Sequence, residues 1–165
     1  MITESESLAQ PLREEVQEHG ALLNLFEEQQ TAILQRDPDL VLNLAEAITR
    51  QLELIRSCQR RRKEAARVAA TEEGCAEQIP LSALISHFPA AAQPMLAALM
   101  VEVNRLIRQT RRRARQNQML LARTIETSQQ ILQRLSPDTI TKTYSSDGRV
   151  EIGASTAERR WAAKS

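Results

Sequence analysis

The side chains of this sequence that are able to do chemistry are few and far apart. The chain has two histidines and two cysteines. His19 falls among apolar residues, where a core or boundary histidine is expected, and His87 has no Asp, Glu or Cys at the spacing of a metal ligand. Cys58 and Cys75 are too few for a disulfide framework, and the sequence has no CxxC, no HExxH and no glycine-rich phosphate loop. We therefore expect no catalytic activity, no metal and no cofactor.

Two clusters of basic residues are the strongest chemical feature. The segment "RRRK" spans residues 60–63, and "RLIRQTRRRAR" spans residues 105–115. Such clusters bind phosphate, so one hypothesis is a nucleic-acid-binding surface. However, the chain carries 22 basic and 21 acidic residues, and only 2% of its residues are aromatic and able to stack on bases. Two other hypotheses are that acidic residues of the same protein neutralise the clusters, or that the clusters bind an acidic protein segment.

The elements that position these clusters are expected to be helices. Leu, Ala, Glu, Gln and Arg dominate the composition, as they do in coiled coils. Asp37 is a good N-cap and Pro38 a good first helical residue, so one helix ends near Arg36 and a second begins at Pro38. Two long amphipathic helices joined this tightly form an antiparallel hairpin. The apolar seam of the first helix is expected to consist of Leu12, Val16, His19, Leu23, Phe26, Gln30 and Ile33.

A third helix and a polar tail complete the predicted organisation. Residues 75–93 form a connector that includes a short helix, and the third helix then extends to Leu135. Beyond it the apolar pattern vanishes and polar residues dominate, which predicts a flexible tail. The fold class is therefore all-α, with an antiparallel helical hairpin and a long third helix forming a coiled-coil-like bundle. We place this bundle at residues 1–136 and the flexible C-terminal tail at residues 137–165.

The hairpin predicts how charged residues face one another. If it turns at residues 37 and 38, the numbers of facing residues sum to about 75. The acidic start of the first helix then lies opposite the first basic cluster, and a third helix that folds back brings the second cluster to a similar level. We expect these acids to balance both clusters, through pairs that fix register more than stability. The expected neighbours are Glu14 with Arg61, Glu15 with Arg60, and Glu18 with Ser57.

The second half of the third helix is the candidate binding surface. This helix is roughly 42 residues or ~60 Å long, so it extends past the turn of the hairpin by about one or two turns. Apolar residues left there without an intramolecular partner mark a docking surface. The alternative is that a shifted register buries them. The residues that we assign to substrate binding are Leu121, Ile125, Ile131, Leu132 and Leu135.

Two segments carry a resemblance to a known family. One is "LLNLFEEQQTAILQRDPDLVLNLAEAITRQLELI", residues 22–55, in which an Arg-Asp turn joins two helices rich in leucine. The other is "TYSSDGR", residues 143–149, which is similar to a Tyr-x-x-x-Gly segment after a last helix. Over about residues 12–150 the chain resembles the FlgN family of flagellar type III export chaperones. The resemblance implies a protein that binds hook–filament junction proteins, prevents their premature assembly or degradation and delivers them to the export gate.

The resemblance also implies a role for the tail. In the family, the C-terminal part carries substrate binding, and the tyrosine of the Tyr-x-x-x-Gly segment docks on the cytoplasmic domain of the export gate. Carried over by position, Tyr144 becomes the docking residue and Gly148 its turn partner. From the residues themselves, tyrosine is a good anchor because it buries a large ring with few torsions frozen. The alternative for Tyr144 is a residue that folds back to cap the bundle.

Two other functions remain open at this point. One is a structural coiled-coil protein that dimerises, and the other, which we disfavour, is a basic helical protein that binds nucleic acid. No apolar run approaches the roughly 18–20 residues of a membrane span, and residues 1–10 are too polar for a signal peptide. We therefore expect a cytoplasmic protein with no membrane insertion, and the sequence leaves homodimerisation open.

Overall fold

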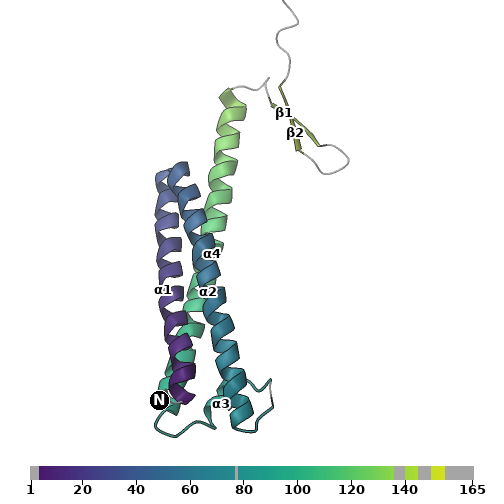
Figure 1. The fold of residues 1–165 in the computed structure, drawn as a ribbon. Helices are drawn as coiled ribbons and strands as arrows, with labels where there is room; N and C mark the ends of the chain where they lie inside the picture. Colours follow the sequence, from purple (N-terminus) through teal and green to yellow (C-terminus); the bar gives the residue numbers. More distant parts are fainter. Residues whose placement is uncertain (1–3, 77, 136–139, 145–149, 155–165) are drawn as a thin grey trace, which may run out of the picture. The chain divides into compact units, whose positions relative to one another are not determined.

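The computed structural model describes residues 4–76, 78–135, 140–144 and 150–154. Over these ranges the backbone is almost entirely helical, which confirms the predicted all-α fold class (Figure 1). Two short strands, which the sequence did not predict, lie within the segment expected to be a flexible tail. The elements are α1 (Glu4–Gln35), α2 (Pro38–Glu72), α3 (Leu81–Ile85), α4 (Gln93–Leu135), β1 (Ile140–Tyr144) and β2 (Val150–Ala154).

The chain divides into two compact units that we describe separately. The first unit is Met1–Leu120 and the second is Leu121–Ser165, so the division falls inside α4. The first unit holds α1, α2, α3 and the first part of α4, and the second holds the rest of α4 and the two strands. The domain boundary that we placed at residue 136 stays a prediction.

The turn between α1 and α2 is built from a few backbone hydrogen bonds. The N–H of Arg36 donates to the carbonyl of Ile33, and the N–H of Asp37 donates to the carbonyl of Ala32, each at 3.1 Å. These two hydrogen bonds cap the C-terminus of α1 in the pattern that requires one residue with a left-handed backbone conformation. That residue is Arg36, whose φ is 56°. The Asp37 side chain then accepts a hydrogen bond from the N–H of Leu40 at 3.0 Å, which confirms the predicted N-cap. One helix therefore ends and the next begins within two residues.

Replacing Arg36 by glycine is expected to stabilise the protein. A left-handed backbone costs a residue with a Cβ about 1 kcal/mol that glycine does not lose, so the gain is about 0.5–1 kcal/mol in free energy of unfolding. Gly74, at the end of α2, has a φ of 66° and supplies the matched control. Gly74→Ala is expected to destabilise by a similar amount. Urea unfolding followed by circular dichroism measures both, and a loss of stability in Arg36→Gly contradicts the argument.

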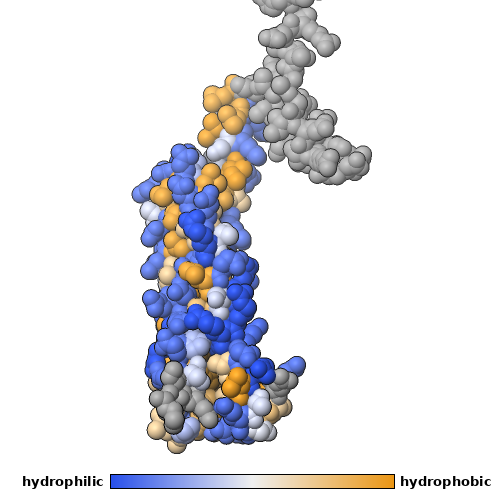
Figure 2. All heavy atoms as spheres, viewed as in Figure 1, coloured by the Kyte–Doolittle hydropathy of each residue, from blue (hydrophilic) through white to orange (hydrophobic). Residues whose placement is uncertain are grey.

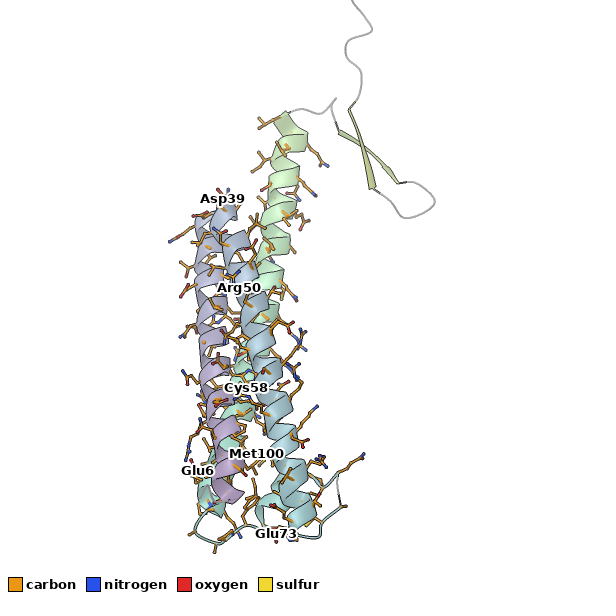
Figure 3. The ribbon with its side chains drawn as sticks, viewed as in Figure 1. Glu6, Asp39, Arg50, Cys58, Glu73 and Met100 are labelled. Atoms are coloured by element: carbon orange, nitrogen blue, oxygen red, sulfur yellow. The ribbon has the colours of Figure 1, made fainter. Side chains whose placement is uncertain are left out.

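The main core lies at the end of the first unit that is far from this turn. Here α3 packs into the same core as residues of α1, α2 and α4, because its apolar Leu84 and Ile85 are buried there. Figure 3 labels Glu73 at this end and Asp39 at the turn of the hairpin. The buried residues of this core are Leu8, Ala9, Leu12, Ala69, Ala70, Leu84, Ile85, Phe88, Leu96 and Val103.

The buried seam of α1 differs from the predicted one in its middle. Leu12 and His19 are buried, as expected. Between them the buried residue is Glu15, which is 0% exposed, whereas the predicted Val16 is only half-buried. Leu12, Glu15, His19 and the buried Leu22 are spaced by three, four and three residues. This spacing fits a heptad repeat as well as the predicted seam through Val16 does. The prediction was wrong here because, of the neighbouring residues Glu15 and Val16, it chose the apolar one for the seam.

The direction of α4 follows from its contacts with α1. Near the start of both helices, Nη2 of Arg13 lies 3.2 Å from Sδ of Met95. Further along both helices, Nη2 of Arg113 lies 3.3 Å from Oε1 of Glu27. The first part of α4 therefore runs parallel to α1 and antiparallel to α2, as the folded-back third helix of the prediction requires (Figure 1).

Ion pairs fix the register of α1 against α2. Nη2 of Arg61 lies 2.5 Å from Oε2 of Glu14, which confirms the predicted pair. Glu15 instead contacts Arg62, at 3.1 Å between Oε1 and Nε, so its predicted proximity to Arg60 was wrong. The physical reason is that a long side chain covers the helical turn before its own Cα. Arg62 thereby reaches the level that the backbone register assigns to residue 60.

One further expectation about charge needs correction. Glu18 accepts a hydrogen bond from Nε2 of Gln51 at 2.5 Å. The acidic start of α1 does not balance the second basic cluster. Arg113 pairs with Glu27 in the second half of α1, and Arg105 pairs with an acid of its own helix. The acids at the start of α1 are already engaged by α2.

Candidate functional site

The second half of α4 exposes a continuous apolar face. In this part of the helix the described side chains are exposed, except for the half-buried Thr124. At about 100° per residue, the five candidate residues share roughly one third of the helix circumference. Figure 2 shows apolar side chains gathered on these last turns. Their exposures are 39% for Leu121, 50% for Ile125, 45% for Ile131, 54% for Leu132 and 75% for Leu135.

This face continues the buried stripe of the same helix. In the first unit α4 buries Leu96, Val103, Thr110 and Asn117, which are spaced by seven residues. The next position in that series is Thr124 and the one after it is Ile131. The amphipathic pattern is therefore uninterrupted along α4, but burial of that stripe ends at Asn117. The sequence left open whether a shifted register buries residues 131–135, and the structure shows Ile131, Leu132 and Leu135 exposed.

The predicted docking tyrosine belongs to a β-hairpin. β1 and β2 pair antiparallel from Ile140 with Ala154 to Tyr144 with Val150. Tyr144 is thus the last residue of β1 before the connection between the strands. Gly148, its predicted turn partner, lies outside the described residues.

Comparison with known proteins decides the family. A family model described as FlgN protein matches residues 1–152, which include every helix and most of the second strand. The chain belongs to the FlgN family. This is a family of chaperones for flagellar assembly and export, and the match confirms the resemblance seen in the sequence. Searches among curated proteins and among solved structures each returned no match.

The described part of this FlgN-family chain offers no metal-binding group of three or more His, Cys, Asp or Glu residues. Cys58 is buried in the α2 seam as expected, and burial raises the pKa of its thiol. No helix among the described residues combines the length and apolar character of a membrane span.

A buried charged cluster lies between α1 and α2, and the sequence analysis missed it. Glu15 and His19 lie one turn apart on α1, and Arg62 of α2 faces Glu15. Burial raises the pKa of Glu15, and the attraction of Arg62 only partly offsets this. Burial, and then the nearby charge of Arg62, lower the pKa of His19. Neither the Glu15 oxygens nor the His19 ring nitrogens have a hydrogen-bond partner among the described residues.

The sequence did contain a sign of this cluster. A glutamate at a heptad position between a leucine and a histidine marks a polar layer in an otherwise apolar seam. Such layers specify register and partner choice in coiled coils, at a cost in stability. We therefore interpret Glu15, His19 and Arg62 as a layer that aligns α1 with α2.

His19 is expected to make stability depend on pH. Because its pKa is lowered in the folded protein, the unfolded chain takes up the proton first as pH falls below about 6.5. Stability from this residue is thus present at neutral pH and lost in mild acid. When pH falls from about 7.5 to about 5.5, the free energy of unfolding should fall more in the unsubstituted chain than in His19→Leu. The difference between the two changes should be up to about 1.4 kcal/mol in favour of His19→Leu.

Urea unfolding at the two pH values measures this difference. Glu15 is present in both proteins and gives each a pH dependence opposite to that of His19. Subtracting the pH dependence of one protein from that of the other removes this contribution to first order. Equal pH dependence in His19→Leu and the unsubstituted chain refutes the prediction.

Proposed function

We propose that this chain is a cytoplasmic export chaperone for hook–filament junction proteins. It binds them before export, prevents their premature assembly or degradation, and delivers them to the export gate. Membership of the FlgN family supports the general role in flagellar export. The observation that carries the finer proposal is the exposed apolar face of α4, residues 121–135.

The face has the properties of a site for an amphipathic helix. A helix recognised by its apolar side presents anchors at i, i+3, i+4 and i+7, and it lies along a complementary apolar surface. On α4, Leu121 and Ile125 are four residues apart, as are Ile131 and Leu135. The last turns of α4 thus offer two successive pairs of anchors. The cargo that fits is a helical terminus that would otherwise pair with another subunit.

Binding to candidate cargo tests this proposal directly. The full chain is co-expressed with junction proteins from its own genome, and the purified material is examined by light scattering. A stoichiometric complex with at least one junction protein supports the chaperone function. If none of them forms a complex, the proposal fails.

We further propose that Tyr144 docks on the cytoplasmic domain of the export gate, and that Gly148 allows the turn beside it. Tyr144 is the last residue of β1. Tyrosine in general is a good anchor because it buries a large, amphipathic ring with few torsions to freeze. Tyr144→Ala is expected to weaken gate binding about tenfold or more, as loss of a central aromatic anchor does. Isothermal titration calorimetry with the purified gate domain measures this. Thr143→Ala, one position earlier in β1, is the control, and an unchanged affinity in Tyr144→Ala excludes docking by that residue.

The same apolar face supports a second candidate function, pairing with another copy of this chain. A continuous apolar stripe on a long helix is what a coiled-coil dimer requires. Sedimentation of the isolated chain separates the two functions. A stable dimer that persists in the presence of junction proteins favours the structural function, whereas a monomer that binds cargo favours the chaperone.

A further inference from the structure

Most arginines of the second basic cluster have no acidic partner in the described part of the chain. Arg105 pairs with Glu102 at 2.5 Å, and Arg113 contacts Glu27 at 3.3 Å. These are the members of the cluster that form ion pairs. The others are exposed and form no ion pair among the described residues: Arg108, Arg111, Arg112 and Arg115.

These four arginines share one face of α4. At about 100° per residue they lie on the side of the helix opposite its buried stripe. Met119, which is 60% exposed, belongs to the same face. Together with Gln116, the arginines and Met119 line a shallow, open groove of about 350 Å³. We call this surface, residues 108–119, the basic face of α4.

We propose that the basic face of α4 binds an acidic amphipathic helix of a partner protein. Unpaired guanidinium groups fit carboxylates because each presents a planar fork that holds two oxygens. The four arginines span residues 108–115, about 10 Å along the helix. Glutamates one turn apart on a partner helix are about 5–6 Å from each other, so two or three of them match this length. Met119 adds a flexible apolar contact at one end of the charged row.

Charge and composition favour this partner over nucleic acid. The net charge of the chain is +1, so no strong overall field attracts a polyanion. The basic row is short compared with a phosphate backbone, and it lies on a single helix. Among the side chains that the structure describes, the aromatic ones are Phe26 and Phe88, and Phe88 is only 3% exposed. Neither lies on α4, so the basic face lacks the stacking surface that single-stranded nucleic acid uses.

The basic face lies in the first unit, on the side of α4 opposite the stripe that the helix buries there. The residues that we assign to cargo, 121–135, belong to the second unit. The two surfaces share no residue, so a protein bound at residues 108–119 does not use the side chains that we assign to cargo. The inference stands independently of the proposed function, since it depends only on the unpaired arginines.

A labelled peptide tests the proposal. The probe is a synthetic amphipathic helix with leucines along one side and glutamates beside them, and its affinity is measured by fluorescence anisotropy in about 150 mM salt. Substituting all four arginines, R108Q/R111Q/R112Q/R115Q, is expected to weaken binding about tenfold or more. The matched control R50Q/R56Q/R60Q/R67Q removes the same charge from exposed positions on α2 and should bind like the unsubstituted chain. The peptide with glutamine in place of glutamate should bind weakly to every variant.

Each outcome decides for or against the proposal. Equal affinity of the acidic peptide for both fourfold variants overturns it. Tighter, arginine-dependent binding of a duplex oligonucleotide overturns it in favour of nucleic acid. A dimer that R108Q/R111Q/R112Q/R115Q converts to a monomer overturns it in favour of a second copy of the chain. If the glutamine variant does not fold by circular dichroism, R108K/R111K/R112K/R115K replaces it, and loss of the bidentate fork should still weaken peptide binding several-fold.

Discussion

Replacing Arg62 by methionine is expected to destabilise the protein by about 2–3 kcal/mol at neutral pH. The substitution leaves the carboxylate of Glu15 buried without a counter-charge, and breaking a fully buried pair in this way costs about 3–5 kcal/mol. The Arg62 side chain is 26% exposed, so water already screens part of the interaction and the expected cost is smaller.

The pH dependence of this loss identifies its cause. The pKa of Glu15 is already raised by burial, and removing Arg62 takes away the attraction that holds it down. A carboxyl whose pKa is raised on folding destabilises the folded state once it ionises, so this penalty is absent at low pH and grows as pH rises through the folded-state pKa. The deficit of Arg62→Met should therefore shrink between neutral pH and about pH 5.

A double substitution separates lost charge pairing from lost packing. Glu15→Leu combined with Arg62→Met removes both charges and is expected to recover most of the stability. Arg56→Met is the control, since Arg56 pairs with Glu53 on the surface of the same helix and should matter by no more than about 0.5 kcal/mol. Urea unfolding gives all four values. If Arg62→Met stays within about 0.5 kcal/mol of the unsubstituted chain at neutral pH, the layer does not act through charge.

Placing aspartates on the apolar face is expected to abolish cargo binding. Ile125→Asp with Leu132→Asp puts two charges where the proposed cargo helix buries its anchors. Loss of a central anchor costs about 2 kcal/mol or more, so the affinity for a junction protein should fall at least about thirtyfold for one site and further for both. Both side chains are about half-exposed in the free chain, 50% and 54%, so the bundle should keep its stability.

Exposed apolar residues of the first unit, outside both proposed binding faces, provide the control. Leu42 and Val101 are 66% and 59% exposed. Leu42→Asp with Val101→Asp introduces the same charge at a similar helix-propensity cost, and it should leave cargo affinity unchanged. Affinities are measured by calorimetry with a purified junction protein. Equal effects of the two double substitutions would place cargo binding outside residues 121–135.

Local chemistry made much of the fold predictable from the sequence. Asp37 and Pro38 define the boundary between α1 and α2 because an N-cap and a helix-starting proline act within one turn of chain. The ends of α2 and α4 likewise follow from where the apolar period stops. The register of the hairpin followed from the position of its turn, and the Glu14–Arg61 pair confirms it.

The candidate site was predictable only in part. The five apolar residues were found because the period of α4 continues past the length of the hairpin, and exposure then confirms that they are accessible. The two strands were missed because residues 137–165 were interpreted as a tail from their polar composition. The segment does contain a local hairpin signal, since β-branched and aromatic residues at 140–144 and 150–152 flank an Asp-Gly pair. Tyr144 was selected by resemblance and not by periodicity.

By itself, the sequence determined the helices, the turn that joins the first two and the apolar stripe that binds them, because each depends on residues within a few turns of one another. Only the tertiary structure decided which side chains of that stripe are buried and which charges are paired. Glu15 is buried in place of Val16, and within the described residues four arginines of α4 form no ion pair. Both results depend on the rotation and reach of side chains between helices. Those two outcomes locate the polar layer of the bundle and the basic face of α4.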